Sequence, residues 1–322
     1  MHLLYSPTVN EKSLEAPTRA LERASLYWEL ARPFTLLPPL LGFVSGAITA
    51  YGAPPRLEIS ADLFWYPFSG CLMAAVLNAG NNALNQIYDL DIDQVNKPLR
   101  PLPSGRLSLR DAWVFTAAAY GLAVLLAYFV NPVGRRECLA VVLFTSVLTW
   151  VYSAPPLQTK RRGFLANVTI AIPRGVLLKV AGWSSVKTIL DDEPWYIGLV
   201  FGLFLLGASS TKDFSDIEGD RRGGCTTLPI LYGVRKAAWL IAPFFIFPFL
   251  LINVGAATGV LSGNRLLLHG LGILLSTYGI YTSYLMVRRP EELATDANHV
   301  SWTHMYLMMM VGQVGFALAY LF

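Results

Sequence analysis

Long apolar segments dominate this sequence of 322 residues and constrain its fold more than any other feature. Hydrophobic residues make up 54% of the chain and charged residues only 14%, whereas soluble domains carry about 25% charge. A helix needs about 20 mostly apolar residues to cross the hydrocarbon core. The sequence therefore predicts an all-α polytopic membrane protein of about nine transmembrane helices, over residues 33–52, 63–88, 112–131, 138–153, 164–184, 193–211, 236–260, 266–287 and 301–322.

The N-terminal residues do not fit a membrane span. They are polar at first and then carry apolar residues at helical spacing, at Leu21, Ala24 and Trp28. We expect a cytoplasmic tail and an interfacial helix over residues 1–30, and a single transmembrane domain over residues 31–322. No apolar run of 7–15 residues typical of a signal peptide opens the sequence, so a cleaved leader is not expected.

The basic residues are distributed unevenly between alternate loops. The N-terminal segment and the loops after the second, fourth, sixth and eighth predicted spans hold 18 of the 25 Lys and Arg residues. Because cytoplasmic loops are enriched in Lys and Arg, this bias predicts a cytoplasmic N-terminus and an external C-terminus. The net charge of +4 suits loops near anionic lipid headgroups, so the expected partner is the lipid bilayer, and nothing indicates nucleic acid.

Two acidic segments close the second and sixth predicted spans, on the predicted cytoplasmic side. In the first, Asn85, Asp89 and Asp93 are spaced four apart and would share one helix face. Like charges on one face are destabilising without counter-charge, and Mg²⁺ takes carboxylate, phosphate and water oxygens together. We predict that the two segments face each other and hold Mg²⁺ ions that bridge a diphosphate. The second segment contributes Asp213, Asp216 and Asp220, spaced three and four apart.

Basic residues accompany both acidic segments on the same predicted side. Lys and Arg make strong charge-assisted hydrogen bonds to phosphate oxygens, and Arg can be bidentate. The alternative explanation for each of the basic residues is that it serves only to orient the chain in the membrane. The set comprises Lys97, Arg100, Arg106, Lys160, Arg161, Lys212, Arg221 and Arg222.

Taken together, these motifs resemble those of the UbiA-type intramembrane prenyltransferases over nearly the whole chain. The first family motif, Asn-x-x-x-Asp-x-x-x-Asp, matches Asn85, Asp89 and Asp93. The second matches the segment from Lys212 to Asp220, and the family's Tyr-Ser-x-Pro-Pro-Leu-x-x-Lys-Arg loop matches residues 152–161. Among members, the sequence looks closest to chlorophyll synthases and to enzymes that prenylate archaeal-type glycerol phosphates or quinone precursors, with no order among them.

The resemblance implies a helical bundle around a central cavity and an Mg²⁺-dependent reaction. An isoprenyl group would pass from a polyprenyl diphosphate to a membrane-associated acceptor, such as an aromatic ring or a quinone precursor. It implies metal ligands at Asn85, Asp89, Asp93, Asp213, Asp216 and Asp220. It implies diphosphate-binding residues at Lys97, Arg100, Tyr152, Lys160, Arg161 and Lys212. It implies catalytic roles for Asp89, Asp93, Asp216, Asp220 and Lys160.

Two basic residues lie inside the fifth predicted span. Arg174 is about ten residues, or about 15 Å, from its start, and a charge at this depth needs a partner. We predict that Arg174 lines a polar cavity wall and meets a carboxylate or phosphate of the acceptor; the alternatives are an internal salt bridge or a side chain that extends towards the membrane interface. Lys179 lies nearer the external end and is expected to extend its ammonium towards the interface.

Two other functions are compatible with a multispan chain that carries buried acids. A UbiA-type terpene cyclase would let the prenyl cation attack itself, and a product assay with and without acceptor separates it from a transferase. A transporter would place its charges at the middle of paired, broken helices. The two acidic segments at helix ends favour the transferase.

Overall fold

Regular structure is entirely helical in the computed structural model, which describes residues 11–295 and 299–322. The helices that correspond to the predicted spans are α2 (Leu37–Gly52), α3 (Asp62–Tyr88), α5 (Leu109–Phe129), α6 (Glu137–Ser153), α7 (Phe164–Ala171), α8 (Leu178–Ser184), α9 (Asp192–Ala208), α12 (Val234–Ile241), α13 (Phe247–Thr258), α14 (Arg265–Arg288) and α15 (Val300–Leu321). Four further helices lie outside the predicted spans: α1 (Glu11–Ala31), α4 (Leu90–Asn96), α10 (Ile217–Arg222) and α11 (Leu228–Tyr232).

Eight helical segments in the described ranges are long and apolar enough to cross a membrane, and their bounds agree with the predicted spans to within three residues. Two of them are composite: α7 continues into α8 through a π-helical turn, Ile172–Leu177, and α12 continues into α13. The remaining predicted span, α6, has 17 residues. That length is at the lower limit for crossing the hydrocarbon core. The all-α membrane fold predicted from the sequence is thus confirmed.

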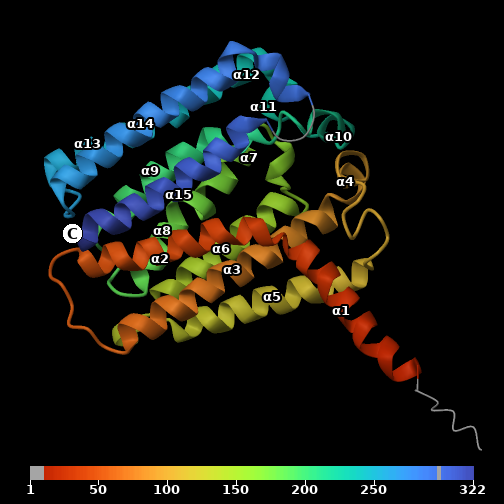
Figure 1. Ribbon diagram of the computed structural model, residues 1–322, viewed down its shortest axis with the longest axis horizontal. Helices are drawn as coiled ribbons and strands as arrows, with labels where there is room; N and C mark the ends of the chain where they lie inside the picture. Colours follow the sequence, from red (N-terminus) through yellow and green to blue (C-terminus); the bar gives the residue numbers. More distant parts are fainter. Residues whose placement is uncertain (1–10, 296–298) are drawn as a thin grey trace, which may run out of the picture.

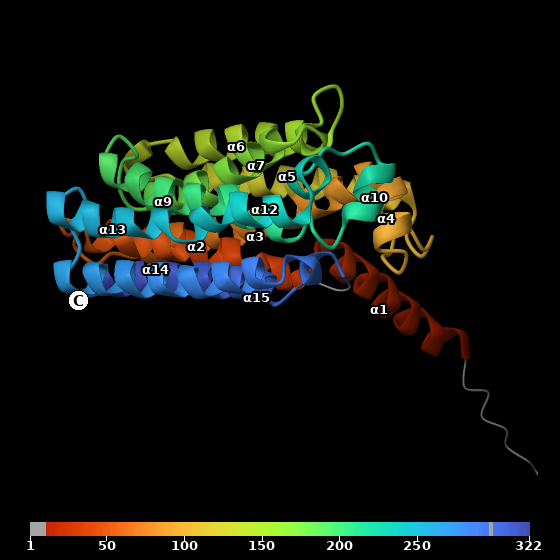
Figure 2. The same ribbon diagram turned by 90° about the horizontal axis from the view of Figure 1, so that it is seen from above.

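The long helices lie roughly side by side along one axis, as Figures 1 and 2 show from two directions. The short helices α4, α10 and α11 gather at one end of the bundle, which we call the rim. Helix α1 leaves the bundle at this same end, and Leu21 and Trp28 on it are exposed. Its role as an interfacial helix, and the boundary at residue 31, remain predictions.

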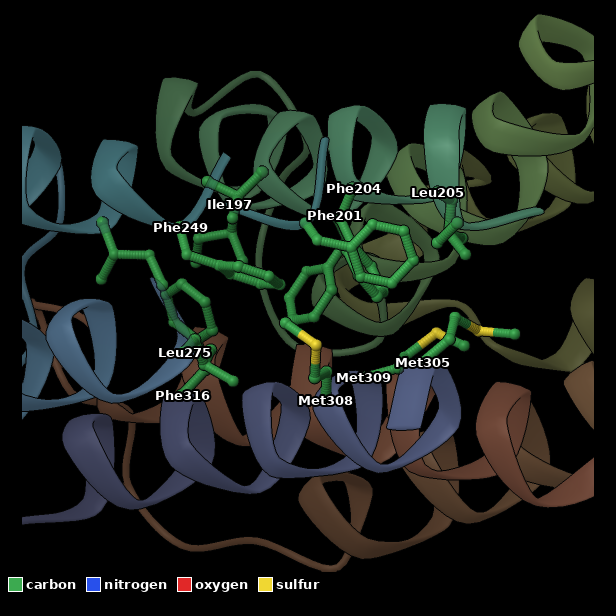
Figure 3. Close-up of a cluster of buried hydrophobic side chains, with 14 of the residues drawn as sticks. Ile197, Phe201, Phe204, Leu205, Phe249, Leu275, Met305, Met308, Met309 and Phe316 are labelled. Atoms are coloured by element: carbon green, nitrogen blue, oxygen red, sulfur yellow. The ribbon is translucent and has the colours of Figure 1, made fainter. Parts of the chain in front are cut away.

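The main core is aromatic and methionine-rich where α9, α13, α14 and α15 meet (Figure 3). Phe201 and Phe204 of α9 are buried against Phe249 and Phe316, with ring centroids 5.1–5.7 Å apart. Elsewhere the helices approach so closely that only small residues fit between them. A Cβ on Gly175 would lie 2.5 Å from the Cα of Gly202, so the π-helical turn rests directly on α9.

The prediction for Lys179 is wrong, because its side chain is fully buried between helices and does not reach the interface. Its ammonium donates to Ser45 Oγ at 2.7 Å and to Gln313 Oε1 at 3.3 Å, and lies 5.3 Å from the centre of the Phe316 ring. Hydroxyl and amide groups from α2 and α15 therefore satisfy the hydrogen bonds of the Lys179 nitrogen inside the bundle.

Candidate active site

The first acidic segment is broken at its middle residue. Helix α3 ends at Tyr88 and α4 begins at Leu90, so Asp89 lies at the junction with φ −102° and ψ 12°. The predicted continuous helix face therefore stops at Asp89. Asp93, one turn into α4, is buried and pairs with Arg100 at 2.5 Å.

The second acidic segment is also not one helix. The last turn of the α9 segment ends at Thr211, and α10 begins only at Ile217. Asp213 lies in the connecting turn, whereas Asp216 occupies the N-cap position of α10. Asp220 lies inside α10, so a turn, an N-cap and a helix present the three carboxylates, and their helical spacing in the sequence does not correspond to a single helix face.

The two acidic segments meet at the rim, as predicted. Asn96, at the end of α4, donates to the carbonyl of Asp216 at 3.1 Å and accepts from the N–H of Gly219 at 3.0 Å. Lys97 lies 3.1 Å from Asp216. Any side chain at position 219 would collide with Asn96, which explains the glycine in the second motif. These contacts hold α4 and α10 together.

A cavity of about 280 Å³ opens beneath the rim. Its walls come from α2, α3, α6, α7, the π-helical turn, α9 and α15, and they are apolar below the acidic residues, with Phe43, Met73 and Leu77 among them. Most of the predicted site residues line it: Asn85, Asp89, Tyr152, Lys160, Arg174, Lys212, Asp213, Asp216 and Asp220. Four others lie outside the lining: Asp93, Lys97, Arg100 and Arg161.

Lysines neutralise two of the cavity's carboxylates. The Lys160 ammonium lies 2.5 Å from Asp89, whose other oxygen accepts from Asn85 at 2.7 Å. Asp216 is paired with both Lys212 and Lys97. Burial opposes its ionisation, but the charges of these two lysines outweigh that effect and lower the pKa of Asp216 below its usual range.

Asp213 and Asp220 have no such partner within 4.0 Å in the part of the chain that the structure describes. Burial, together with repulsion from Asp220, raises the pKa of Asp213 to about 8. Burial, together with repulsion from Asp216, raises that of Asp220 to about 7. Neither carboxyl has a cation of the described residues against it, so a bound cation is what would favour the ionised form of both.

The carboxylates do not converge into a closed protein site. Across residues 11–295 and 299–322, no group of three or more His, Cys, Asp or Glu side chains is arranged to hold a metal ion alone. Mg²⁺ is usually held by one or two carboxylates, with water and substrate phosphates completing its coordination. The residues present fit that mode, in which the ion is bound together with a diphosphate.

Arg174 lies in the π-helical turn and is half-buried against the cavity. Pro173, which lacks an N–H, interrupts the helical hydrogen bonds immediately before it. No carboxylate of the described residues lies within 4.0 Å of its guanidinium. The internal salt bridge considered from the sequence is therefore not seen, and the side chain faces the cavity.

Several cavity-lining polar and aromatic residues were not singled out from the sequence. In the sequence, Arg32 is one of several basic residues near the N-terminus, and only its position immediately before Pro33 distinguishes it. The amides of α3 offered the clearest signal, because four asparagines within one span are costly in a membrane unless they meet polar partners. The overlooked residues are Arg32, Asn78, Asn82, Asn167, Trp302 and Tyr306.

The sequence matches the UbiA prenyltransferase family over residues 33–319. It is 36% identical over 220 residues to the digeranylgeranylglyceryl phosphate synthase of Methanopyrus kandleri, which covers 68% of this chain and 74% of the relative. It is 29% identical over 223 residues to the chlorophyll synthase of Arabidopsis thaliana, covering 66% of this chain and 54% of that protein. A UbiA homologue from Archaeoglobus fulgidus, solved with GPP and Mg²⁺, superposes with a TM-score of 0.72 at 21% identity, over 92% of this chain and 99% of that one.

The fold and the sequence matches define a membrane-embedded prenyl-transferring enzyme. The chain belongs to the UbiA prenyltransferase family. The transporter considered from the sequence has no support in these matches, since the relatives are named as synthases and transferases.

Proposed function

We propose that the protein transfers an isoprenyl group from a polyprenyl diphosphate to a membrane-associated acceptor, with Mg²⁺ as cofactor and diphosphate as the leaving group. The observation that carries this proposal is the meeting of both acidic segments at the rim of one cavity, where buried carboxylates exceed the paired cations. The homologue of A. fulgidus, solved with GPP and Mg²⁺, supports the donor and the metal by analogy.

The rim would hold the donor's diphosphate. Mg²⁺, when bound, supplies charge neutralisation at the leaving diphosphate. Its proposed ligands are Asn85, Asp89, Asp213, Asp216 and Asp220. Asp93, which the sequence also predicts as a ligand, lies outside the cavity lining, and its proposed role is to hold Arg100. The hydrogen-bond donors to phosphate oxygens are Lys97, Arg100, Tyr152, Lys160, Arg161 and Lys212.

The cavity below the rim would hold the prenyl chain. Departure of diphosphate leaves an allylic cation, which water would quench. The apolar side chains of Phe43, Met73 and Leu77 exclude water from this space and favour attack by an electron-rich carbon or oxygen of the acceptor. Arg174, on the wall of the same cavity, is proposed to bind an acidic group of that acceptor.

The rim is proposed to face the cytoplasm, with the N-terminus on the same side. The distribution of Lys and Arg supports this orientation, since most of them lie in the loops at the rim end. Tagging the two termini and testing protease access in sealed vesicles would check it. An N-terminal tag protected in inside-out vesicles would contradict it.

Product analysis tests the proposed reaction. Purified protein in lipid nanodiscs is given geranylgeranyl diphosphate and Mg²⁺, with geranylgeranylglyceryl phosphate, a quinone-precursor ring or no acceptor, and the lipids are analysed by mass spectrometry. A prenylated product only when an acceptor is present is the expected result. A cyclised hydrocarbon without acceptor would establish the terpene cyclase instead, and intact donor in every arm would contradict the proposal.

A further inference from the structure

A second hollow lies on the outside of the bundle, apart from the cavity beneath the rim. It is a groove of about 830 Å³ between α7, α9, α11 and α12, beside the rim (Figure 1). Eight of its ten lining residues are apolar or aromatic, and the other two are Arg235 and Lys236. None of the ten also lines the cavity beneath the rim, so the groove is separate from the candidate active site.

The apolar walls of the groove are open to the surroundings of the bundle. Phe164, Tyr232 and Trp239 are each between 45% and 60% exposed. The segments that contain α7, α9 and α12 are all long and apolar enough to cross a membrane. A large exposed apolar surface of this kind marks a site where another apolar molecule binds. Within a bilayer that molecule is a lipid or another membrane protein.

Two cations stand without a counter-charge at the rim end of this groove. Arg235 and Lys236 occupy the first turn of α12, which holds no acidic residue. The N-terminus of a helix already carries partial positive charge, so two further cations are unfavourable there. No carboxylate of the described residues lies within 4.0 Å of either side chain, and no Asp or Glu lines the groove. An anion bound from outside the protein would compensate them.

The length of the groove matches one leaflet of a bilayer. Phe244 lies nine residues after Arg235, or about 15 Å further along the helical segment. The hydrocarbon core is about 30 Å thick, so one leaflet contributes about 15 Å. Tyr232 and Trp239 lie within four residues of Arg235, and such aromatic residues are enriched where hydrocarbon meets the headgroups. The groove thus suits a molecule with a charged end and an apolar chain.

We propose that the groove binds an anionic phospholipid, whose phosphate contacts Arg235 and Lys236. Its acyl chain would lie against Trp239, Leu240 and Phe244. Charge-assisted hydrogen bonds to phosphate oxygens are strong, and basic residues next to a span attract anionic headgroups. An apolar helix of a second protein would cover the walls but leave both cations uncompensated, which favours the lipid. The bias of basic residues towards one side explains their charge, but not their position at an apolar groove.

A lipid in this groove would also contact the chain segment that leads to the rim. Leu228 of α11 lines the groove, whereas Thr227, the residue before it, lines the cavity beneath the rim. Thr226 donates to the carbonyl of Arg161 through its N–H at 3.1 Å and through its hydroxyl at 2.8 Å. We therefore expect a bound lipid to hold α11 in place and to slow hydrogen exchange of its backbone.

A titration with single lipids tests the site. Full-length protein in detergent is titrated with phosphatidylglycerol or phosphatidylcholine of matched acyl chains, and native mass spectrometry measures the bound lipid. We expect wild type to bind phosphatidylglycerol about tenfold more tightly than phosphatidylcholine. The double variant Arg235→Gln/Lys236→Gln should lose this difference. Arg110→Gln should keep it, because Arg110 is likewise exposed in the first turn of a spanning helix, α5, but does not line the groove.

Hydrogen exchange measured with the same lipids locates the binding. Phosphatidylglycerol should slow exchange of Leu228–Tyr232 in wild type and have no such effect in the double variant. If the double variant does not fold, Arg235→Gln decides against Arg110→Gln, since each removes one exposed arginine. A larger loss of the lipid preference in Arg235→Gln supports the site, and an equal loss in both refutes it.

Three further outcomes would overturn the proposal: equal affinity of wild type for both lipids, an undiminished preference in the double variant, or unchanged exchange of α11 when phosphatidylglycerol is bound. A dimer of wild type that excludes the lipid would assign the groove to a second copy of the chain instead. No prenyl transfer is measured in these experiments, so their results and those that test the proposed reaction are independent.

Discussion

The ammonium of Lys97 lies 3.1 Å from a carboxylate oxygen of Asp216, although 118 residues separate them in the sequence. Lys97 follows the first acidic segment, and Asp216 belongs to the second. Together with the hydrogen bonds of Asn96, this pair makes the two motifs one structural unit at the rim. A substitution in either motif is therefore expected to alter the structure of the other.

We expect Asp89→Ala and Asp216→Ala each to lower the rate of prenyl transfer at least a hundredfold. Each removes a carboxylate that faces the cavity and leaves a lysine without its counter-charge: the buried Lys160 in one case and the half-buried Lys212 in the other. The measurement is the initial rate with saturating donor, at matched amounts of folded protein. Asp91→Ala is the control, because Asp91 is exposed and is not part of the cavity lining. Near-normal turnover in Asp89→Ala or Asp216→Ala would remove that residue from the proposed metal site.

Removal of divalent metal should silence the enzyme. The lysines of the rim neutralise the carboxylates that surround them, so they supply too little charge for a departing diphosphate as well. Turnover in EDTA should fall to background and return when Mg²⁺ is added in excess. Full activity in the chelator would show that the protein's own cations suffice.

Arg174→Gln should weaken the use of an acidic acceptor selectively. Losing one charged contact to a partly desolvated anion costs about 1.5–3 kcal/mol, or about ten- to a hundredfold in acceptor kcat/KM. The apparent affinity for the prenyl diphosphate should stay nearly unchanged. Arg265→Gln, an exposed arginine at the start of α14, is the matched control. An equal loss for both substrates would argue that Arg174 has only a structural role.

The metal-free protein should become less stable as the pH rises from about 4 to about 8. Across this range the folded state binds more protons than the unfolded state, because burial and repulsion raise the pKa of Asp213 to about 8 from an unfolded value of 3.8. The free energy of unfolding therefore falls with rising pH. Asp213→Asn removes the contribution of Asp213 to this dependence, so the melting temperature of the variant in EDTA should fall less than that of wild type as the pH increases. If the melting temperatures of Asp213→Asn and wild type changed in parallel with pH, the raised pKa of Asp213 would be contradicted.

The spans were predictable because apolar length alone determines which segments cross a bilayer. The break in the first acidic motif at Asp89 was not predictable. Helix α4, which begins after this break, contacts α10, and four further spans separate the two helices in the sequence. The left-handed backbone at Arg32 could not be predicted for a similar reason. Amides on α3, about 50 residues further along the chain, bond to the carbonyls of Leu30 and Ala31 that precede it.

Lys179 shows how local pattern can mislead in a membrane protein. Its position near the external end of a span suggested a side chain that reaches the headgroups. The partners that keep it inside, Ser45 and Gln313, come from the first and last spans and carry no charge. Nothing at its own place in the sequence identifies them.

The lysine pairs at the rim also bear on how the substrate would enter. Asp89 and Asp216 already have counter-ions, so Mg²⁺ and diphosphate would arrive by an exchange of partners: each carboxylate passes from a lysine to the metal, and each freed lysine turns to a phosphate oxygen. The lysines and carboxylates that take part then have a counter-charge both before and after the exchange. We therefore expect the protein without substrate to stay folded in buffers that contain no magnesium.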